Sequence, residues 1–271
     1  MPELPEVETT KRGIEPHIVG KKISDIVIRE KRFRWPIQNC LKKNITGKII
    51  LSISRRSKYI LFHLENGCFM IHLGMSGSLR IITNDQPIKK HDHIDIQVNE
   101  NKIIRFNDPR RFGSLLWLGK QPYKHFLLNK LGPEPLSEEF TSDYLFNKSR
   151  NRKLPIKNFI MNNNIVVGVG NIYANEALFI SGIRPSKPTY RVTKKDFEKL
   201  TDAIVKVLTL SIEMGGTTLK DFVDSSGNPG YFQQTLFVYG RNKMLCKICS
   251  NKIHLQHIGQ RSSYFCKNCQ K

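Results

Sequence analysis

Four cysteines near the C-terminus restrict the fold of that end of the chain more than any other feature. They are spaced C-x2-C-x16-C-x2-C, at Cys246, Cys249, Cys266 and Cys269. Each C-x-x-C pair supplies two thiolates from one tight turn, and two such turns close a tetrahedral site with no open position. The module that contains these cysteines has only about 35 residues and cannot bury a sufficient core alone. A bound metal would supply the missing folding free energy. The spacing predicts one structural zinc ion, with an iron–sulfur centre or a redox pair as alternatives.

The charge balance predicts a polyanionic partner. The 271 residues include 44 Lys+Arg against 23 Asp+Glu, a formal net charge of +21. Such a surplus attracts polyanions and releases counterions from phosphates. A compositional bias from an AT-rich genome accounts for part of the lysine excess, but it does not predict where the arginines lie. With 39% hydrophobic residues, the chain can form real cores and has room for two or three small domains.

The sequence predicts a soluble protein of the cytoplasm. No apolar run is long enough to span a bilayer, and the acidic N-terminus lacks the features of a signal peptide. In a reducing compartment the C-x-x-C spacing favours a metal over disulfides, while Cys40 and Cys68 stand alone.

Short apolar or alternating runs indicate strands between about residues 20 and 118. Turn residues separate them, for example Glu65-Asn66-Gly67. About eight strands at this spacing indicate an antiparallel sandwich or barrel. We expect one helix before them, from Glu6 until Gly13 and Pro16 end it. The runs are Ile23–Arg29, Ile49–Ile53, Tyr59–Leu64, Cys68–Leu73, Ser78–Ile82, Ile94–Val98, Lys102–Phe106 and Ser114–Leu118.

Around Leu131–Pro135 two prolines and a glycine indicate a linker, and helical periodicity follows it. The clearest helix covers Lys194–Met214, with Thr193 as its N-cap and Gly215-Gly216 as its end. Residues 141–149, 155–162 and 171–181 are also expected to be helical.

The N-terminus offers a nucleophile. If the initiator Met1 is removed, Pro2 carries a free secondary amine, and a terminal amine has a pKa of roughly 8 against roughly 10.4 for lysine. Such amines form Schiff bases with carbonyl carbons. Glu3 and two further glutamates follow closely, so a general acid is available. The alternative is that a proline after methionine is common and usually inert.

Further motifs have both a functional and a structural interpretation. The glycine-rich segment before Asn171 can bind phosphate at the start of a helix, or Asn171 can simply cap that helix. The turn that carries Arg110 and Phe112 can fill the space left by a flipped base, or it can be a solvated turn with a core phenylalanine. His91 and His93 are expected to contact phosphate or to pack, rather than to chelate a metal.

These motifs occur in an order that identifies a family. Met1–Glu8, Lys58, the loop H-L-G-M-S-G, the turn D-P-R-R-F-G, the segment V-G-V-G-N-I-Y-A-N-E and the four cysteines resemble bacterial formamidopyrimidine-DNA glycosylase over essentially the full length. The resemblance implies an α+β multidomain fold. It comprises an N-terminal antiparallel β-sandwich (residues 1–130), a helix–two-turn–helix domain (131–225) and a C-terminal zinc ribbon (237–271).

The resemblance also implies a reaction. The enzyme would remove 8-oxoguanine and formamidopyrimidines from double-stranded DNA and then cleave the abasic strand by β,δ-elimination. Pro2 would attack the sugar C1′ and form the Schiff base, with Glu3 as general acid. Lys58 would donate the proton in β-elimination and Arg261 in δ-elimination. We expect a monomer.

The resemblance further implies a DNA-binding set. His91, Arg110 and Arg152 match DNA-contact positions, although a close relative has lysine at the place of Arg152. Met75, Arg110 and Phe112 match the triplet that fills the void after base flipping, and Lys220 begins a loop that covers the lesion. Ser263 stands where threonine is common, with little expected effect. The residues expected to contact the phosphates of the lesion strand near the flipped nucleotide are Lys58, His72, Asn171, Tyr239 and Arg261.

Two alternatives remain open. Endonuclease VIII is a sister enzyme that prefers oxidised pyrimidines, but Leu4 and the complete wedge triplet argue against it. The other alternative is a zinc-ribbon DNA-binding protein that kept the fold and lost its catalytic activity. The presence of Pro2, Glu3 and Lys58 argues against it.

Overall fold

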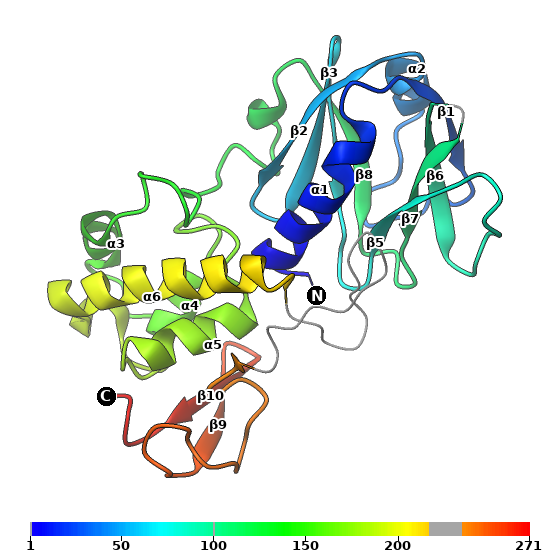
Figure 1. The fold of residues 1–271 in the computed structure, drawn as a ribbon. Helices are drawn as coiled ribbons and strands as arrows, with labels where there is room; N and C mark the ends of the chain where they lie inside the picture. Colours follow the sequence, from blue (N-terminus) through cyan, green and yellow to red (C-terminus); the bar gives the residue numbers. More distant parts are fainter. Residues whose placement is uncertain (1, 100, 217–234) are drawn as a thin grey trace. The chain divides into compact units, whose positions relative to one another are not determined.

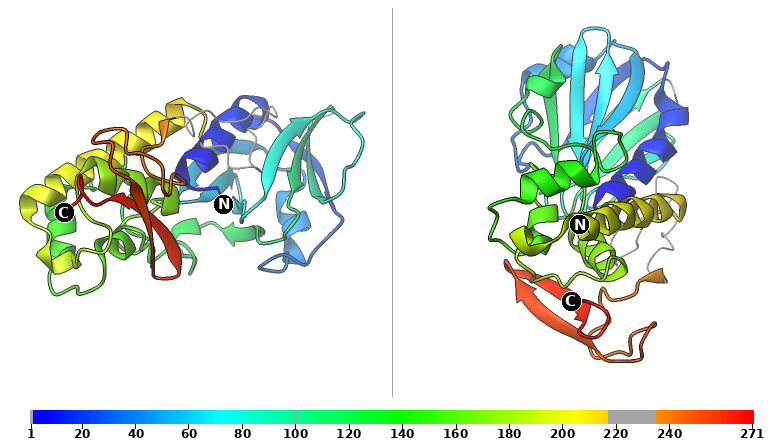
Figure 2. Two further views of the ribbon diagram at one scale, coloured as in Figure 1. Left: turned by 90° about the horizontal axis from the view of Figure 1, so that it is seen from below. Right: turned by 90° about the vertical axis from the view of Figure 1, so that its left-hand side faces the viewer.

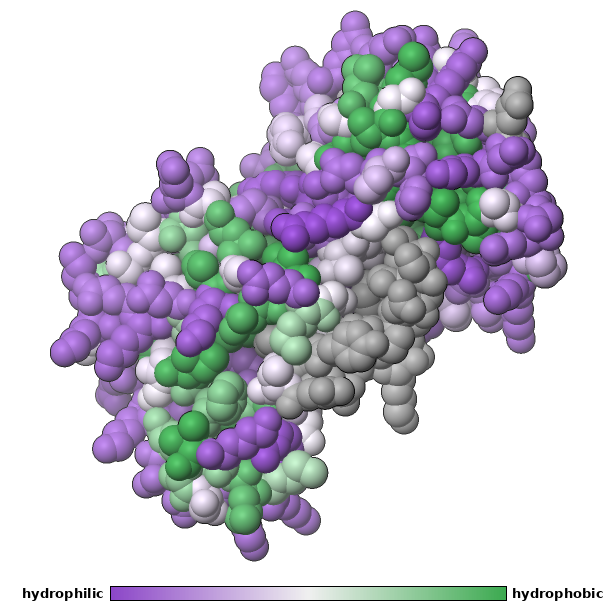
Figure 3. All heavy atoms as spheres, in the orientation of Figure 1, coloured by the Kyte–Doolittle hydropathy of each residue, from purple (hydrophilic) through white to green (hydrophobic). Residues whose placement is uncertain are grey.

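The computed structural model describes residues 2–99, 101–216 and 235–271. These residues form two compact units, the first of residues up to 129 with 214–216 and the second of 130–213 with 235–271 (Figure 1). Figure 3 shows hydrophilic side chains over much of the visible surface of each unit. Within the described ranges, no helix has both the length and the hydrophobicity needed to cross a bilayer.

The first unit is an antiparallel β-sandwich. One sheet has the order β1-β6-β7-β5 and the other β2-β3-β4-β8. Because the first sheet interleaves distant strands, local sequence could not distinguish a sandwich from a barrel. The bounds are α1 Leu4–Ile18, β1 Ile23–Ile28, α2 Cys40–Ile45, β2 Ile50–Arg56, β3 Tyr59–Leu64, β4 Gly67–His72, β5 Ser78–Ile82, β6 Asp92–Val98, β7 Lys102–Asn107, β8 Ser114–Gly119 and the 3-10 turn η1 Pro122–Lys124.

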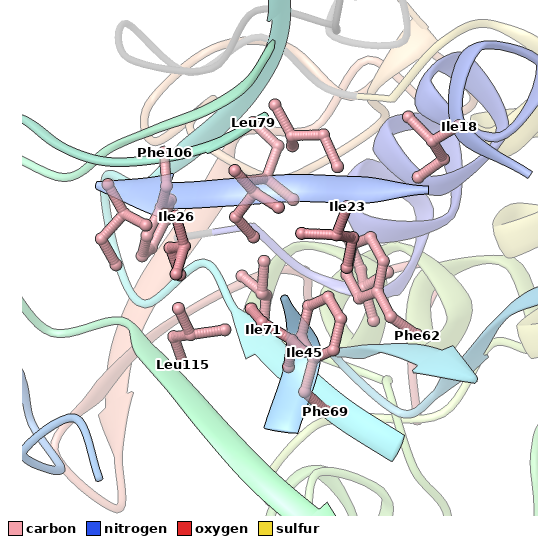
Figure 4. Close-up of a cluster of buried hydrophobic side chains, with 14 of the residues drawn as sticks. Ile18, Ile23, Ile26, Ile45, Phe62, Phe69, Ile71, Leu79, Phe106 and Leu115 are labelled. Carbon is pink, nitrogen blue, oxygen red and sulfur yellow. The ribbon is translucent and has the colours of Figure 1, made fainter. Parts of the chain in front are cut away.

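Side chains from the facing surfaces of the two sheets form one core (Figure 4). Phe62 and Phe69 stack with ring centroids 4.5 Å apart, and both are fully buried. Ile26 and Phe106 face them from the other sheet. These strands contribute their buried apolar positions mostly as short runs, which explains why they were recognisable in the sequence.

The predicted end of the first helix was wrong. α1 begins at Leu4 and continues through Gly13 and Pro16 to Ile18. Pro16 lies in the last turn, so its missing N–H removes only one helical hydrogen bond. Ile14 and Ile18 are fully buried and hold this end of the helix against the sandwich. The short helix α2 was not predicted, because six residues provide too little periodicity.

The second unit begins with helices near the predicted positions, and Figure 1 shows the helix α5 beside the strand β10 of the same unit. Thr193 caps α6 as expected, since its Oγ1 accepts the N–H of Asp196 at 3.1 Å. The bounds are α3 Ser142–Ser149, α4 Ile156–Ile160, α5 Asn171–Ile180, the 3-10 turn η2 Thr189–Arg191, α6 Lys194–Glu213, β9 Ile253–Ile258 and β10 Arg261–Cys266.

The strands β9 and β10 form an antiparallel hairpin (Figure 2). Gly259 and Gln260 connect them, and both have positive φ, as a type I′ turn requires. The α+β class with a β-sandwich, a helical region and a C-terminal cysteine-bearing hairpin is thus confirmed.

Candidate functional site

The start of α1 holds the two predicted catalytic residues, Pro2 and Glu3. Both are buried, and Glu3 is the N-cap of the helix. The Glu3 side chain accepts the N–H of Glu6, while Oε2 of Glu6 accepts the N–H of Glu3 at 2.8 Å. This capping box fixes the backbone that follows Pro2. Glu6 was not among the predicted site residues, although the E-x-x-E spacing of a capping box is present in the sequence.

A chain of polar contacts connects α1 to the hairpin turn that carries Lys58. Oε2 of Glu8 accepts from Nε of Arg55 at 2.8 Å, and Nη1 of Arg55 donates to the carbonyl oxygen of Ser57 at 3.0 Å. Ser57 has a φ of 56°, so the turn between β2 and β3 is tight. The backbone next to Lys58 is therefore positioned by the helix that bears Glu3.

His72, at the end of β4, is held in one protonation state and one tautomer. Burial, together with the positive charges of Lys58 and Arg34, lowers the pKa of His72 to about 4. Nδ1 accepts the N–H of Gly74 at 3.0 Å. The imidazole is therefore neutral near pH 7, with its proton on Nε2, where it can serve as a hydrogen-bond donor.

Met75, Arg110 and Phe112 lie on two loops that are tied together. Oγ of Ser76 donates to Oδ1 of Asp108 at 3.2 Å, and the N–H of Gly113 donates to Oδ2 at 2.8 Å. Met75 is 37% exposed and Phe112 is 44% exposed, so Phe112 is not the core phenylalanine of the structural interpretation. Two exposed apolar side chains on neighbouring loops are suited to insert as a wedge between base pairs.

Two details show how closely these loops approach. A Cβ at Gly74 would lie 2.5 Å from the main-chain carbon of Phe112, so only glycine fits there. The guanidinium carbon of Arg110 lies 5.0 Å from the Phe112 ring centroid. Arg110 and Phe112 thus form one cationic and aromatic surface.

His91 precedes β6 with a φ of 72°, and its ring centroid lies 5.9 Å from that of His93. Nε2 of His93 lies 3.1 Å from the carbonyl oxygen of Asp108, and the N–H of Asp108 donates to the His91 carbonyl oxygen. The contact of its ring nitrogen supports the packing role for His93. The main-chain hydrogen bond places His91 beside the turn that carries Arg110.

In the second unit, Asn171 is the first residue of α5, and Gly170 is its N-cap without a side-chain cap. The capping interpretation of Asn171 was therefore wrong. Its Oδ1 is buried and has no hydrogen-bond partner within the described ranges. Arg152 is exposed in the loop between α3 and α4, whereas Lys220 lies outside the described residues.

Tyr239 is placed by Glu176 of α5. The Glu176 carboxylate accepts three main-chain N–H groups, from Phe237 at 2.8 Å, Val238 at 3.0 Å and Tyr239 at 2.8 Å. Burial raises the pKa of Glu176, and these donors oppose that shift. Sequence reasoning missed Glu176, because its partners lie about sixty residues away.

Arg261 begins β10, directly after the tight turn, and is exposed. Behind it, Nζ of the fully buried Lys157 donates to the carbonyl oxygen of Ser262 and to Oγ of Ser263, both at 2.7 Å. Oδ1 of Asn175 accepts the N–H of Tyr264 at 2.7 Å. Helices α4 and α5 thus hold the strand that carries Arg261, through residues that the sequence analysis did not single out.

The four predicted cysteines come together. Their Sγ atoms all lie within 4.8 Å of one another, with Cys246 and Cys269 3.9 Å apart and Cys249 and Cys266 3.4 Å apart. A tetrahedral ion with Zn–S bonds of 2.3 Å needs sulfur separations of about 3.8 Å. The cluster therefore fits a metal with four thiolate ligands.

Comparisons with known proteins agree with this geometry. Residues 1–115 match the family model of the formamidopyrimidine-DNA glycosylase N-terminal domain, and residues 131–223 match the model of its H2TH domain. A formamidopyrimidine-DNA glycosylase of Hydrogenovibrio crunogenus is 52% identical over 271 residues, covering all of this chain and 97% of the relative.

Solved structures show the same fold. The complex of Lactococcus lactis Fpg with DNA that contains an abasic site has a TM-score of 0.92 at 35% identity, with both chains fully covered. A MutM complex with DNA that contains carbocyclic 8-oxo-G has a TM-score of 0.91 at 35% identity, also with full coverage of both chains. The chain belongs to the formamidopyrimidine-DNA glycosylase family.

Proposed function

We propose that this DNA glycosylase of base-excision repair uses the amine of Pro2 as its nucleophile and Glu3 as its acid. The enzyme class follows from family membership, and the residue roles are the proposal. The observation that carries it is the capped start of α1, where Pro2 directly precedes the buried and hydrogen-bonded Glu3. The positive end of a helix dipole also disfavours an added positive charge, which favours the uncharged amine.

The proposed reaction begins with base loss. The Pro2 nitrogen forms a bond to the sugar C1′ as the glycosidic bond breaks, and Glu3 gives its proton to the departing base. The resulting Glu3 carboxylate takes the proton from the Pro2 nitrogen and passes it to the ring oxygen, so that the sugar ring opens. The nitrogen lone pair then forms the C1′ iminium, a Schiff base. Removal of a C2′ proton expels the 3′ phosphate, and a second elimination expels the 5′ phosphate. Lys58 and Arg261 are the proposed proton donors of these two steps.

Base loss requires the nucleotide to leave the duplex, because stacking hides the glycosidic bond. We assign Met75, Arg110 and Phe112 to the vacated space, and His72 and Asn171 to the phosphates. His72 is suited to this role because it is neutral and can donate from Nε2. Asn171 would donate from its Nδ2 to a phosphate oxygen, because an amide NH2 group is a donor and a phosphate oxygen is an acceptor.

The remaining assignments extend this binding surface. We propose that His91, Arg152, Tyr239 and Lys220 contact DNA. We infer that the substrate is duplex DNA with an oxidised purine or an abasic site, that the enzyme acts as a monomer, and that it works in the cytoplasm, where bacterial DNA lies. We also keep the domain limits 1–130, 131–225 and 237–271 as a proposal.

The metal of the four-cysteine cluster is proposed to be zinc. Cys246, Cys249, Cys266 and Cys269 would hold it, and it would stabilise the fold of the hairpin that presents Arg261. Elemental analysis of the native protein should give one zinc per chain. The Cys249→Ser variant should lose zinc and DNA binding, and a native protein without zinc would contradict the assignment.

Borohydride trapping on a duplex with 8-oxoguanine tests the nucleophile. Intact mass should show loss of Met1, and the reduced adduct should map to Pro2. The Glu3→Gln variant should bind the lesion duplex but not excise the base. An adduct on Lys58, or excision by Glu3→Gln at the wild-type rate, would overturn these roles. A duplex with an oxidised pyrimidine serves as the comparison substrate, and a preference for it would favour the endonuclease VIII alternative.

A further inference from the structure

A basic hollow lies on the first unit beside the Arg110 turn, and apart from Arg110 its lining residues have no role in the steps above. It has a volume of about 450 Å³ and is lined by four cationic residues, Arg80, Lys89, Lys90 and Arg110, with two serines, an asparagine and a proline. No carboxylate is among the lining residues. The hollow lies where the ends of β5, β6 and β7 meet, since Asn107 is paired with both Ser78 and Asp92.

The positive charge at the hollow is only partly neutralised. Asp92 pairs with Arg80 at 2.8 Å and with Arg105 at 3.5 Å, and Asp95 pairs with Arg105 at 2.8 Å and Arg29 at 2.6 Å. Three arginines thus share two aspartates beneath it. For Lys89, Lys90 and Arg110, no ion pair is found within the described ranges, although the buried Asp108 accepts the main-chain N–H of Arg110. The surface keeps an excess of positive charge.

The backbone of the two lysines is fixed. Oδ2 of Asp92 accepts the N–H of Lys89 at 2.8 Å, and Nδ2 of Asn107 donates to the carbonyl oxygen of Lys90 at 3.1 Å. Both side chains are exposed. Lysine ammonium groups bind phosphate as point charges, and an anchored loop loses less conformational entropy when it does so. The hollow is therefore suited to an anion.

Arg110 connects this hollow to the proposed wedge, because it both lines the hollow and lies over the Phe112 ring. We propose that Arg80, Lys89 and Lys90 form a subsite for backbone phosphates of the duplex that flank the site of base flipping. This subsite rests on the proposed function. It supplies affinity and orientation, and it does not read the lesion.

The same sheet provides a matched control. Lys21 and Lys22 are also adjacent and exposed, and they line another basic hollow with Lys102. That hollow lies at the opposite end of β6, because Ile23 pairs with Val98 there. The two hollows are separated by the length of the strand, on the order of 20 Å. Removing two lysines at either end changes the net charge equally.

The experiment compares Lys89→Ala/Lys90→Ala with Lys21→Ala/Lys22→Ala. Equilibrium binding to a lesion duplex is measured over a range of salt concentrations. Each phosphate contact contributes about 0.9 to the slope of log K against log salt. The Lys89/Lys90 variant should lower the magnitude of the slope by roughly 1 to 2 and weaken binding about tenfold or more near physiological salt. The Lys21/Lys22 variant should leave the slope nearly unchanged, and both should keep the wild-type melting temperature.

A methylphosphonate scan then locates the contact. Each phosphate near the lesion is neutralised in turn on either strand. At one or two positions the substitution should weaken binding of the wild type but not of the Lys89/Lys90 variant.

Equal slopes for the two variants, or no such position in the scan, would overturn the subsite. Protection of Lys89 and Lys90 from acylation is measured as a further test. If inorganic phosphate at matched ionic strength protects these lysines as well as the duplex does, the proposed subsite for duplex phosphates is also wrong. The proposed function fails separately, if the wild type does not excise 8-oxoguanine.

Discussion

The main-chain N–H of Glu3 donates to Oε2 of Glu6 at 2.8 Å, so the proposed acid and its neighbour one turn later cap the same helix end. Glu6→Ala should weaken this cap by about 0.5–2 kcal/mol and lower single-turnover excision about tenfold, since Glu3 is no longer held. Glu6→Gln should retain most activity, because glutamine also completes a capping box. Excision by Glu6→Ala at the wild-type rate would refute a positioning role for Glu6.

Lys157 is expected to be essential for the placement of Arg261. Lys157→Met leaves the Ser262 carbonyl oxygen and the Ser263 hydroxyl without their ammonium donor, which should destabilise the protein by about 1–3 kcal/mol. The fraction of δ-elimination product should fall, while zinc content stays at the wild-type level. The exposed Lys153 provides the control variant Lys153→Met. Equal product ratios in the two variants would contradict this prediction.

Arg110→Ala should weaken excision and reduce the preference among bases opposite 8-oxoguanine. An arginine that reads a base edge contributes roughly 1–3 kcal/mol of discrimination. Cleavage of a preformed abasic site should suffer less, because flipping is easier there. Single-turnover rates opposite each of the four bases provide the measurement. The control is Arg111→Ala, since Arg111 pairs with Glu30 at 3.0 Å. Unchanged ratios in Arg110→Ala would mean that Arg110 does not read the opposite base.

His72 should make stability depend on pH below about 6.5. Burial lowers its pKa to about 4 in the folded protein, against about 6.5 when unfolded, so the unfolded state binds more protons between these values. The contribution of neutral His72 to stability is fully present above pH 6.5 and is lost as the pH falls to about 4. Urea unfolding at a series of pH values should show a shallower decline for His72→Gln than for the wild type. Parallel curves would show that His72 does not titrate in this window.

The sequence was most informative where structure depends on near neighbours. The eight strands alternate or form short apolar runs, and the cysteine spacing alone identified a four-thiolate cluster. The end of α1 was wrong, because burial of Ile14 and Ile18 outweighs one lost hydrogen bond at Pro16. The choice between sandwich and barrel needed the pairing of β1 with β6, which local sequence does not contain.

The roles of Lys58 and Arg261 and most of the DNA-contact assignments came from the family resemblance, but the residues that support these positions did not. Lys157 and Glu176 contact segments that follow them by many tens of residues. In a sequence, a buried lysine on a short helix cannot be distinguished from a solvated one. The exposure of Met75 and Phe112 also needed the structure, because both residue types are usually found in cores.

The contacts of α5 with the segment that carries the four cysteines have a consequence for protein engineering. Glu176 and Asn175 accept only main-chain N–H groups at positions 237, 238, 239 and 264. Every residue except proline offers that group, so these bonds do not depend on the side chains of the hairpin. A hairpin from a distant relative, grafted after residue 235, should therefore dock on the same helix. The residues of α5 can then stay constant while the segment after residue 235 is exchanged.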